Sequence, residues 1–155
     1  HKLSDYANFD NNSNLISFEE FYKIPADIYV PAALEDQITK ENAHDLQCKL
    51  IIEAANGPVT VNAENICYDK GIHIIPDILA NSGGVLVSYY EWLQNKNNEK
   101  FTEEEIINKF ESKLKTISNN IFNEFYNSKL DKITLRDISY LHSLRNLQRE
   151  FDKLV

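Results

Sequence analysis

Three short apolar runs, separated by helical segments, are the feature that most limits what this chain can fold into. The runs lie at residues 27–30, 50–53 and 72–75, and each has the length of a buried strand rather than of a helix. Two helical patterns separate them, at residues 39–46 and 62–70. Strands that alternate with helices at this spacing pair in parallel, through right-handed crossovers. The sequence therefore predicts an α/β fold with a parallel sheet.

Capping residues support the assignment of helices around this core. Ser17 and Glu20 have the spacing of a capping box, which predicts a short helix at residues 15–23. Gly71 directly follows the helix expected at 62–70, in the position where a left-handed residue ends a helix. Both helices are therefore bounded by residues suited to their ends.

The last third of the chain is predicted to be helical. A helix at residues 85–94 follows a pair of glycines, Thr102 and Glu105 form a second capping box, and a final helix begins near Thr134. Apolar residues recur every three or four positions, which predicts faces that pack against the sheet or a neighbouring domain. These residues are Ile106, Phe110, Leu114, Ile117, Ile121 and Phe125, followed by Ile138, Leu141, Leu144 and Leu147.

Charge and composition exclude several classes of protein. The chain has 155 residues, and 24 acidic against 16 basic side chains give a formal charge of −8, so neither nucleic acid nor an anionic membrane is an expected partner. No apolar run reaches the roughly 20 residues of a bilayer span. Cys48 and Cys67 lack metal-ligand spacing and are expected to be reduced, intracellular thiols. The chain lacks Met, and we interpret it as a piece of a longer polypeptide.

Small or rigid residues follow each of the three predicted strands. They lie at residues 31–33, at 54–58, and at 76–77 together with 81–84. One explanation is tight turn chemistry alone. Because the carboxyl ends of parallel strands meet at one edge, where ligands bind in open sheets, three such clusters favour a binding cleft.

One face of the helix after the glycine pair carries residues suited to a polar ligand. Asn81, Val85, Ser88 and Trp92 are spaced by four, three and four positions and so share that face. A hydroxyl and an amide near a helix N-terminus can hold a partly anionic group. The alternative is a core face in which Ser88 bonds back to the carbonyl of Gly84.

Known catalytic motifs are absent from the sequence. It has no GxSxG, HExxH, P-loop or GxGxxG, and no two of its four histidines have metal-ligand spacing. A dinucleotide-binding domain needs a glycine-rich first turn for the pyrophosphate, and that turn would lie before His1. From the residues alone, the chain is half of a doubly wound α/β domain with a ligand cleft.

Three segments resemble the carboxy-terminal, cofactor-binding domain of glutamate dehydrogenases, in the Glu/Leu/Phe/Val dehydrogenase family. They are residues 31–43, 52–58 and 75–92, the last reading IPDILANSGGVLVSYYEW, and the ordered resemblance spans about 24–96. The later helices fit the family less specifically, with Arg145 in an Arg-containing final helix. The last segment resembles the branch found in animals, archaea and many bacteria.

The resemblance implies a partial Rossmann-like, doubly wound sheet with C-terminal helices. Residues 1–96 would be the distal part of the NAD(P)-binding domain, and 97–155 the helices that pack on it or on a neighbour. The implied activity is the reversible, NAD- or NADP-dependent oxidative deamination of L-glutamate to 2-oxoglutarate and ammonium. A leucine or phenylalanine dehydrogenase, or a non-catalytic Rossmann-like interaction module, is the alternative.

Site residues follow from the resemblance position by position. Its implied cofactor-binding residues are Ala33, Ala54, Ala55, Asn56 and Asn81, and its implied substrate-binding residues are Val85 and Ser88. Ala54 stands where the family usually has Gly, so its methyl group is expected to crowd the cofactor. Ser82 replaces a common Ala, a change that a helix N-terminus tolerates.

The family's catalytic residues lie outside the resembling segments. Its general-base Asp and its Lys residues belong to an amino-terminal domain, so we expect this chain alone to be inactive. The first βαβ unit of the cofactor domain is also missing, which would expose an apolar strand edge. The full-length protein is expected to be a homo-oligomer, a hexamer in the family, in the cytoplasm or the mitochondrial matrix.

Overall fold

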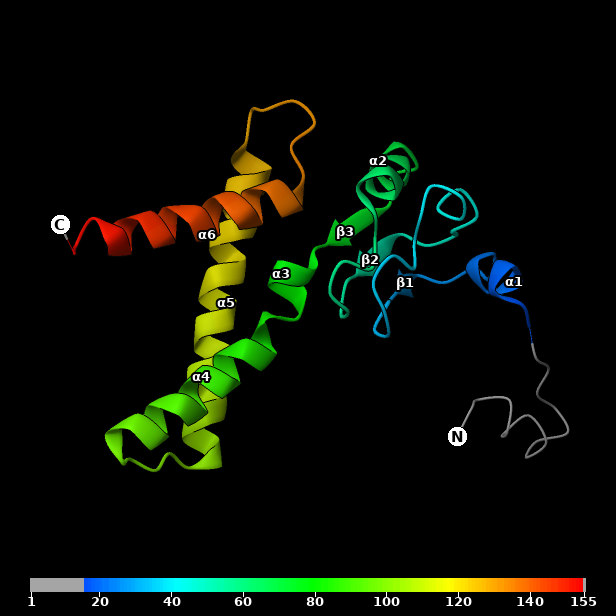
Figure 1. Cartoon of the computed structure of the whole chain (residues 1–155). Coiled ribbons are helices and arrows are strands. Elements are labelled where there is room, and N and C mark those ends of the chain that lie inside the picture. The colour runs from blue at the N-terminus through cyan, green and yellow to red at the C-terminus, as the bar shows by residue number, and fades with distance from the viewer. Residues whose placement is uncertain (1–15, 155) are drawn as a thin grey trace, which may run out of the picture.

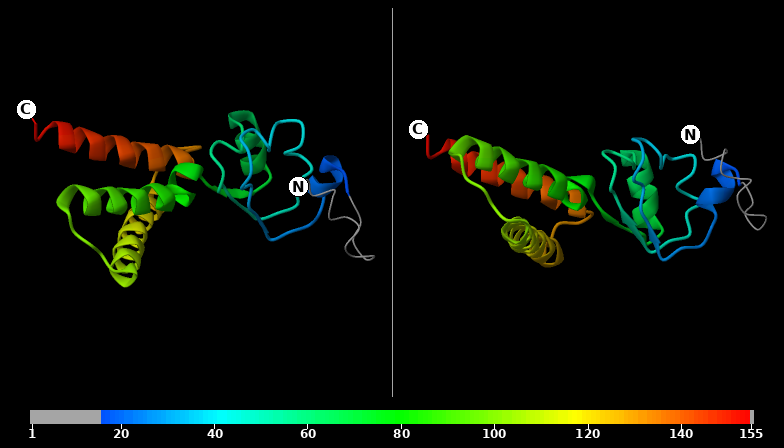
Figure 2. Two further views of the ribbon diagram at one scale, coloured as in Figure 1. Left: turned by 60° about the horizontal axis from the view of Figure 1, so that its bottom comes forward. Right: turned by 90° about the horizontal axis from the view of Figure 1, so that it is seen from below.

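The computed structural model describes residues 16–154, which form three strands and six helices. In chain order these are α1 (Phe18–Tyr22), β1 (Ile28–Tyr29), β2 (Leu50–Ile52), α2 (Val61–Asp69), β3 (His73–Ile75), α3 (Asp77–Ala80), α4 (Ser82–Asn97), α5 (Glu103–Asn127) and α6 (Leu135–Phe151). Helices α4, α5 and α6 gather at one end of the molecule, and the sheet lies with α1 and α2 at the other (Figures 1 and 2).

The sheet is parallel, in the order β1-β2-β3. Ile28 pairs with Leu50, and Ile51 pairs with Ile74. The three predicted strands are confirmed, and each is one or two residues shorter than expected. Helix α2 is the crossover between β2 and β3, so the predicted α/β architecture is confirmed as well.

The prediction of a helix at residues 39–46 is wrong, because residues 40–45 form turns. Asn42 explains the difference. Its side-chain Oδ1 accepts the Thr39 N–H at 2.8 Å, and its Nδ2 donates to the Gln37 carbonyl at 2.8 Å. Bonds of this kind offer the backbone an alternative to the helical ladder, and here that alternative wins.

The capping box predicted for α1 is present. Ser17 accepts the Glu20 N–H at 3.2 Å, and the Glu20 carboxylate accepts the Ser17 N–H at 2.8 Å. Leu15, the first residue of the expected helix, lies outside the described residues. The helix is anchored by Tyr22, which is buried and whose hydroxyl donates to the Gln37 carbonyl at 2.8 Å.

Two other helices differ from expectation at their ends. Thr60 caps α2, so Asn62 lies inside that helix and does not begin it, whereas Gly71 follows it with a φ of 75° as predicted. Helix α4 spans Ser82–Asn97 and so exceeds the expected 85–94 at both ends. The short α3, which the sequence did not indicate, connects β3 to α4.

The two C-terminal helices begin as predicted. The capping box at the start of α5 joins Thr102 and Glu105, and α6 begins after Thr134, which forms a further capping box with Asp137. Glu103, Glu104 and Glu105 lie in the first turn of α5, where carboxylates suit the positive end of the helix dipole.

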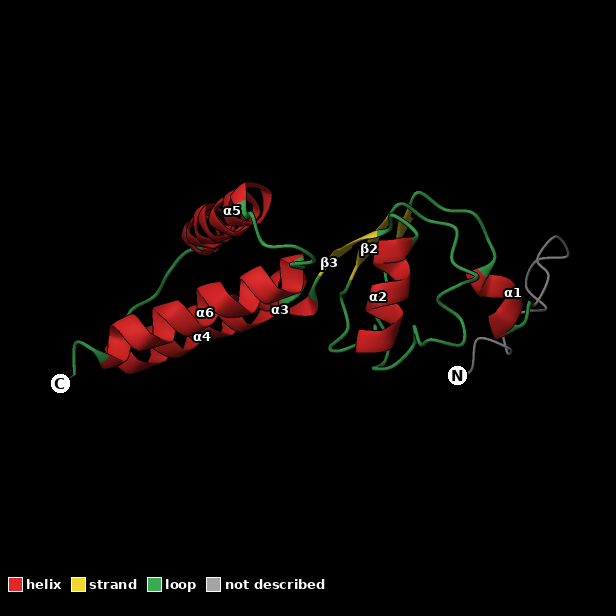
Figure 3. Cartoon of the chain, turned by 90° about the horizontal axis from the view of Figure 1, so that it is seen from above, coloured by secondary structure: helices red, strands yellow, loops and turns green. Residues whose placement is uncertain are grey.

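Two clusters of buried apolar residues hold the fold together. In the first, α2 covers one face of the sheet (Figure 3) and packs Ala63 and Cys67 with Ile51 and Ile74, all at most 2% exposed. The second joins α3, α5 and α6 through Leu79, Ile121, Leu135 and Ile138. Of the predicted apolar faces, Ile121 of α5 and Ile138 of α6 are thus buried.

The far end of α6 differs from its beginning. Leu144 and Leu147 belong to the predicted apolar face, yet they are 60% and 58% exposed. Within the described residues, no helix has the length and apolar character needed to cross a membrane.

Candidate functional site

A pocket of about 720 Å³ opens at the carboxyl end of the sheet, beside the start of α4. All seven predicted site residues line it. Its lining consists of Ala33, Leu34, Glu35, Ala54, Ala55, Asn56, Asn81, Gly84, Val85 and Ser88. The segments after β1 and β2 and the first turns of α4 therefore meet at one edge, as the positions of the small residues predicted, while the roles of the seven residues stay predictions.

Two asparagines connect the walls of this pocket. Nδ2 of Asn81 donates to Oδ1 of Asn56 at 2.7 Å and to the Ala54 carbonyl at 3.3 Å. A side-chain amide has two N–H donors and an acceptor oxygen, so Asn81, whose two donors are both used, retains its Oδ1 as an acceptor, and Asn56 retains the donors of its Nδ2. The pair thus joins the loop after β2 to the start of α4 and can still bind a carboxamide.

Backbone bonds hold the loop after β2 in place. The N–H groups of Ala54 and Ala55 both donate to the Pro31 carbonyl, at 3.1 and 2.9 Å. The Glu53 N–H donates to the Ile75 carbonyl at 3.1 Å. These bonds continue the parallel pairing beyond the ends of the strands and place the Ala-Ala-Asn segment at the pocket.

Helix α4 presents its first turns to the pocket. Its N-cap residue, Asn81, makes no side-chain capping bond, and its Nδ2 donates to the loop after β2. The Val85 side chain is 75% exposed and lines the pocket with Ser88. Among the described residues, no hydrogen bond joins Ser88 to the Gly84 carbonyl, so the structure does not favour the core-face alternative. An uncapped helix N-terminus is suited to an anionic group.

The glycine pair of α4 has two different functions in the fold. A Cβ on Gly83 would lie 2.8 Å from Cε2 of Phe110, so this glycine allows α5 to pack closely against α4. A Cβ on Gly84 would meet nothing within 4 Å, and Gly84 lines the pocket. The sequence indicated a small residue at both positions but could not distinguish these reasons.

A cluster of ion pairs that the sequence did not indicate lies behind the pocket. Arg136, in the first turn of α6, donates to Glu53 at 2.6 Å, to Glu64 at 3.0 Å and to Asp77 at 3.0 Å. Burial lowers the pKa of Arg136, but its bonds to Glu53 and the charge of Glu64 outweigh that effect and raise it. The partners lie 59 to 83 residues away in sequence, beyond any local pattern.

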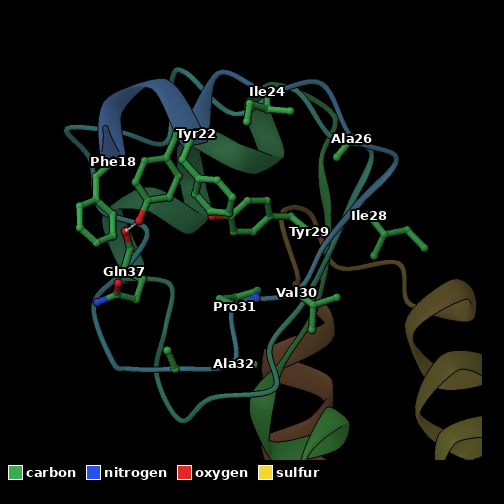
Figure 4. Close-up of a pocket in the computed structure, with 12 residues that line it drawn as sticks. Phe18, Tyr22, Ile24, Ala26, Ile28, Tyr29, Val30, Pro31, Ala32 and Gln37 are labelled. Carbon is green, nitrogen blue, oxygen red and sulfur yellow. Dashed lines mark hydrogen bonds between the residues drawn. The ribbon is translucent and has the colours of Figure 1, made fainter. Parts of the chain in front are cut away.

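A second pocket, of about 550 Å³, lies between α1 and β1 (Figure 4). Phe18, Tyr22, Ile24, Ile28 and Tyr29 are among its mainly apolar lining residues. Burial raises the pKa of Tyr29 to about 12, so its phenol stays protonated at neutral pH. This pocket extends to Ala33, which it shares with the first.

Neither cysteine has the environment of a reactive thiol. Cys67 is buried, and burial raises its pKa to about 11, while Cys48 is partly buried and its pKa is raised for the same reason. Both are free thiols. Residues 16–154 contain no group of three or more His, Cys, Asp and Glu side chains that could hold a metal ion.

The chain matches the family described as Glutamate/Leucine/Phenylalanine/Valine dehydrogenase over residues 1–153. It is 43% identical over 149 residues to the NAD-specific glutamate dehydrogenase of Clostridioides difficile, a match that covers 94% of this chain and 34% of that relative. Across three such curated relatives the chain spans 28%, 31% and 34% of their length, or about a third.

Solved structures agree with this match. Glutamate dehydrogenase from Peptoniphilus asaccharolyticus superposes with a TM-score of 0.68 and 42% identity, over 77% of this chain and 29% of that one. The hetero-hexameric glutamate dehydrogenase from Thermus thermophilus, in its leucine-bound form, gives a TM-score of 0.81 and 28% identity, over 95% of this chain and 35% of that one. The predicted Rossmann-like fold is confirmed, and the chain belongs to the Glutamate/Leucine/Phenylalanine/Valine dehydrogenase family.

Proposed function

We propose that this chain forms the cofactor- and substrate-binding wall of a glutamate dehydrogenase. The reaction is the reversible conversion of L-glutamate, water and NAD(P)⁺ to 2-oxoglutarate, ammonium, NAD(P)H and a proton. One observation supports this most directly: a single pocket is lined by Asn56, Asn81, Val85 and Ser88, and its two amides are joined by a hydrogen bond. The relatives named as NAD-specific favour NAD over NADP.

The loops at the ends of β1 and β2 suit a dinucleotide. Ala33, Ala54 and Ala55 are small, so a ligand can approach their backbone closely. In the proposed complex Ala33 faces the adenosine side, and the two later alanines follow the ribose and nicotinamide. Asn56 lies beside the nicotinamide, and Oδ1 of Asn81 accepts an N–H of its carboxamide.

The face of α4 suits an amino acid with a second carboxylate. Val85 is exposed in the pocket and packs against the methylene chain of glutamate. Ser88, one turn further along the helix, donates its hydroxyl to the side-chain carboxylate.

The chain's contribution to the reaction is placement. The bound cofactor supplies the hydride acceptor, and the residues of this pocket hold the two reactants at reacting distance and exclude water from between them. Proton transfer is assigned to an Asp, and carboxylate binding and water activation to Lys residues, of the amino-terminal domain that the family carries. We therefore propose that residues 1–96 and 97–155 act only as part of a longer, oligomeric enzyme, a hexamer in the family.

A serine substitution tests this assignment in the full-length protein. Ser88→Ala removes one hydrogen bond to a charged group, which is worth about 1.5–3 kcal/mol. We expect kcat/KM for glutamate to fall roughly 10- to 150-fold while the Kd of NADH changes little. Ser112→Ala, on the exposed side of α5, is the matched control and is expected to leave both constants unchanged.

The same preparation separates the alternative activities. Steady-state rates with glutamate, leucine and phenylalanine should rank glutamate first, because among the three only glutamate has a side-chain carboxylate for Ser88 to bind. A higher kcat/KM for leucine, or no effect of Ser88→Ala on glutamate turnover, would refute the proposed substrate. Absence of turnover with all three would favour a non-catalytic module.

A further inference from the structure

Three carboxylates from three different elements converge on the guanidinium of Arg136. Glu53 follows β2, Glu64 lies on α2, and Asp77 begins α3, and each accepts from a different guanidinium nitrogen. Glu53 is fully buried, Glu64 is 6% exposed, and the Arg136 side chain is 17% exposed. A guanidinium is the one side chain whose planar fork can serve three acceptors in fixed directions at once.

Two of these carboxylates bond to backbone N–H groups of segments that lead into the pocket. Oε2 of Glu53 accepts the Asp77 N–H at 2.8 Å, and Oδ2 of Asp77 accepts the Gly57 N–H at 2.8 Å. Glu53 directly precedes the Ala54–Ala55 segment, and Gly57 directly follows Asn56. The loop that carries Asn56 is therefore held at both ends by groups bonded to Arg136.

The same bonds reach the second asparagine. Asp77 is the first residue of α3, the short helix whose C-cap residue is Asn81. The Asn81 N–H donates to the Asp77 carbonyl at 3.0 Å, so the position of Asp77 fixes where Asn81 enters the pocket. The third carboxylate, Glu64, lies on α2, which does not line the pocket.

We propose that Arg136 is a positioning residue for this pocket: through Glu53 and Asp77 it sets the geometry at which Asn56 meets Asn81. It touches neither ligand. Because Arg136 belongs to α6, the C-terminal helices are coupled to ligand binding at the sheet edge. The effect on NADH binding rests on the proposed function, whereas the effect on the loop does not.

Hydrogen exchange in the full-length protein tests the positioning without any ligand. Arg136→Lys keeps the charge but replaces the fork by a single ammonium, which cannot serve Glu53 and Asp77 in the same directions. We expect the amides of Gly57 and Asp77 to exchange about tenfold faster, because their carboxylate acceptors are released. Peptides that cover residues 54–58 and 76–82 report this change.

Two control variants separate positioning from general loss of stability. Ile138→Val removes a buried methyl group two residues along the same helix and leaves every Arg136 bond intact. Glu64→Gln changes the one arm of the cluster that does not reach the pocket. Both controls are expected to leave exchange in residues 54–58 and 76–82, and the Kd of NADH, within about twofold of the parent, whereas Arg136→Lys raises that Kd about tenfold.

Each outcome decides the matter. Unchanged exchange in Arg136→Lys overturns the proposal. If the parent protein binds NADH, faster exchange in Arg136→Lys with an unchanged Kd overturns it too, because the cluster then has only a structural role. Equal effects of Arg136→Lys and Ile138→Val on the Kd overturn it as well. If the parent does not bind NADH, but Arg136→Lys accelerates exchange in residues 54–58 and 76–82 and nowhere else, then Arg136 does position the loop and the proposed function is wrong.

Discussion

Glu64 is the carboxylate of the Arg136 cluster whose charge is least well compensated. One of its oxygens accepts from Nε of Arg136, while Oε1 is buried and has no hydrogen-bond partner among the described residues. Burial raises the pKa of Glu64, and the opposing charge of Arg136 only partly offsets it. Paired and buried carboxylates can therefore still be unfavourable in their charged form.

The raised pKa predicts how Glu64 affects stability at different pH. The folded state binds this proton more tightly than the unfolded state, so the stabilising contribution is complete below about pH 4.5 and is lost as the pH rises through the raised pKa. Glu64→Gln removes the ionisation. We expect the melting temperature of the variant minus that of the parent to be larger at pH 8 than at pH 4.5.

Thermal unfolding of the full-length protein at several pH values measures this difference. Glu99→Gln is the matched control, because Glu99 is exposed. The control should give the same difference from the parent at each pH. A Glu64→Gln variant that loses stability relative to the parent as the pH rises would contradict the account.

The sequence predicted the place of a single residue only where that residue's partners lie close to it in sequence. Asn81, Val85 and Ser88 share a helix face, so their common position followed from the spacing alone. Arg136 has partners 59 or more residues away, and nothing in its neighbourhood distinguishes it from Arg145 or Arg149. A buried ion-pair cluster is specified by the tertiary fold, which is why it was missed.

At the scale of secondary structure, the packing of α4 against α5 depends on one glycine. Gly83 leaves room for the ring of Phe110, whereas Gly84 faces open space in the pocket. The two adjacent positions thus offer a matched pair of substitutions, one that tests helix packing and one that tests the pocket.

Alanine at these two positions should have opposite consequences. Gly83→Ala places a methyl group 2.8 Å from Phe110, and we expect it to lower stability by about 1–3 kcal/mol through overpacking. Gly84→Ala should leave stability unchanged or slightly raised, because alanine favours a helix. It should weaken ligand binding, because the methyl group enters the pocket.

Chemical denaturation and NADH titration of the two full-length variants check this pair. Equal loss of stability in both, or tighter NADH binding by Gly84→Ala, would contradict the packing that the structure shows. Sequence alone could predict that a helix begins here but not which glycine serves which purpose, since that depends on where α5 crosses α4.

Elements were predictable where one signal dominated. Strands followed from short apolar runs, and α1, α5 and α6 from their capping residues. The segment 39–46 contains a capping residue and a helical apolar pattern, but the side chain of Asn42 bonds to the backbone and stabilises turns instead. A local side-chain bond thus outweighed helix propensity.

At the scale of the whole molecule, the pocket lies where the two halves of the chain meet. The sheet loops supply Ala33, Ala54, Ala55 and Asn56, and α4 supplies Gly84, Val85 and Ser88. Helix α6 reaches back from the C-terminal helices to hold the sheet loop through Arg136 (Figure 1). The sequence indicated both halves but gave no sign of the link between them.

A crystal structure of the full-length protein with NAD⁺ and 2-oxoglutarate tests the central claim most directly. We predict that the nicotinamide carboxamide lies about 3 Å from the amide of Asn81, and that a carboxylate of 2-oxoglutarate lies about 3 Å from the hydroxyl of Ser88. Both ligands bound elsewhere, with this pocket filled by solvent, would contradict it.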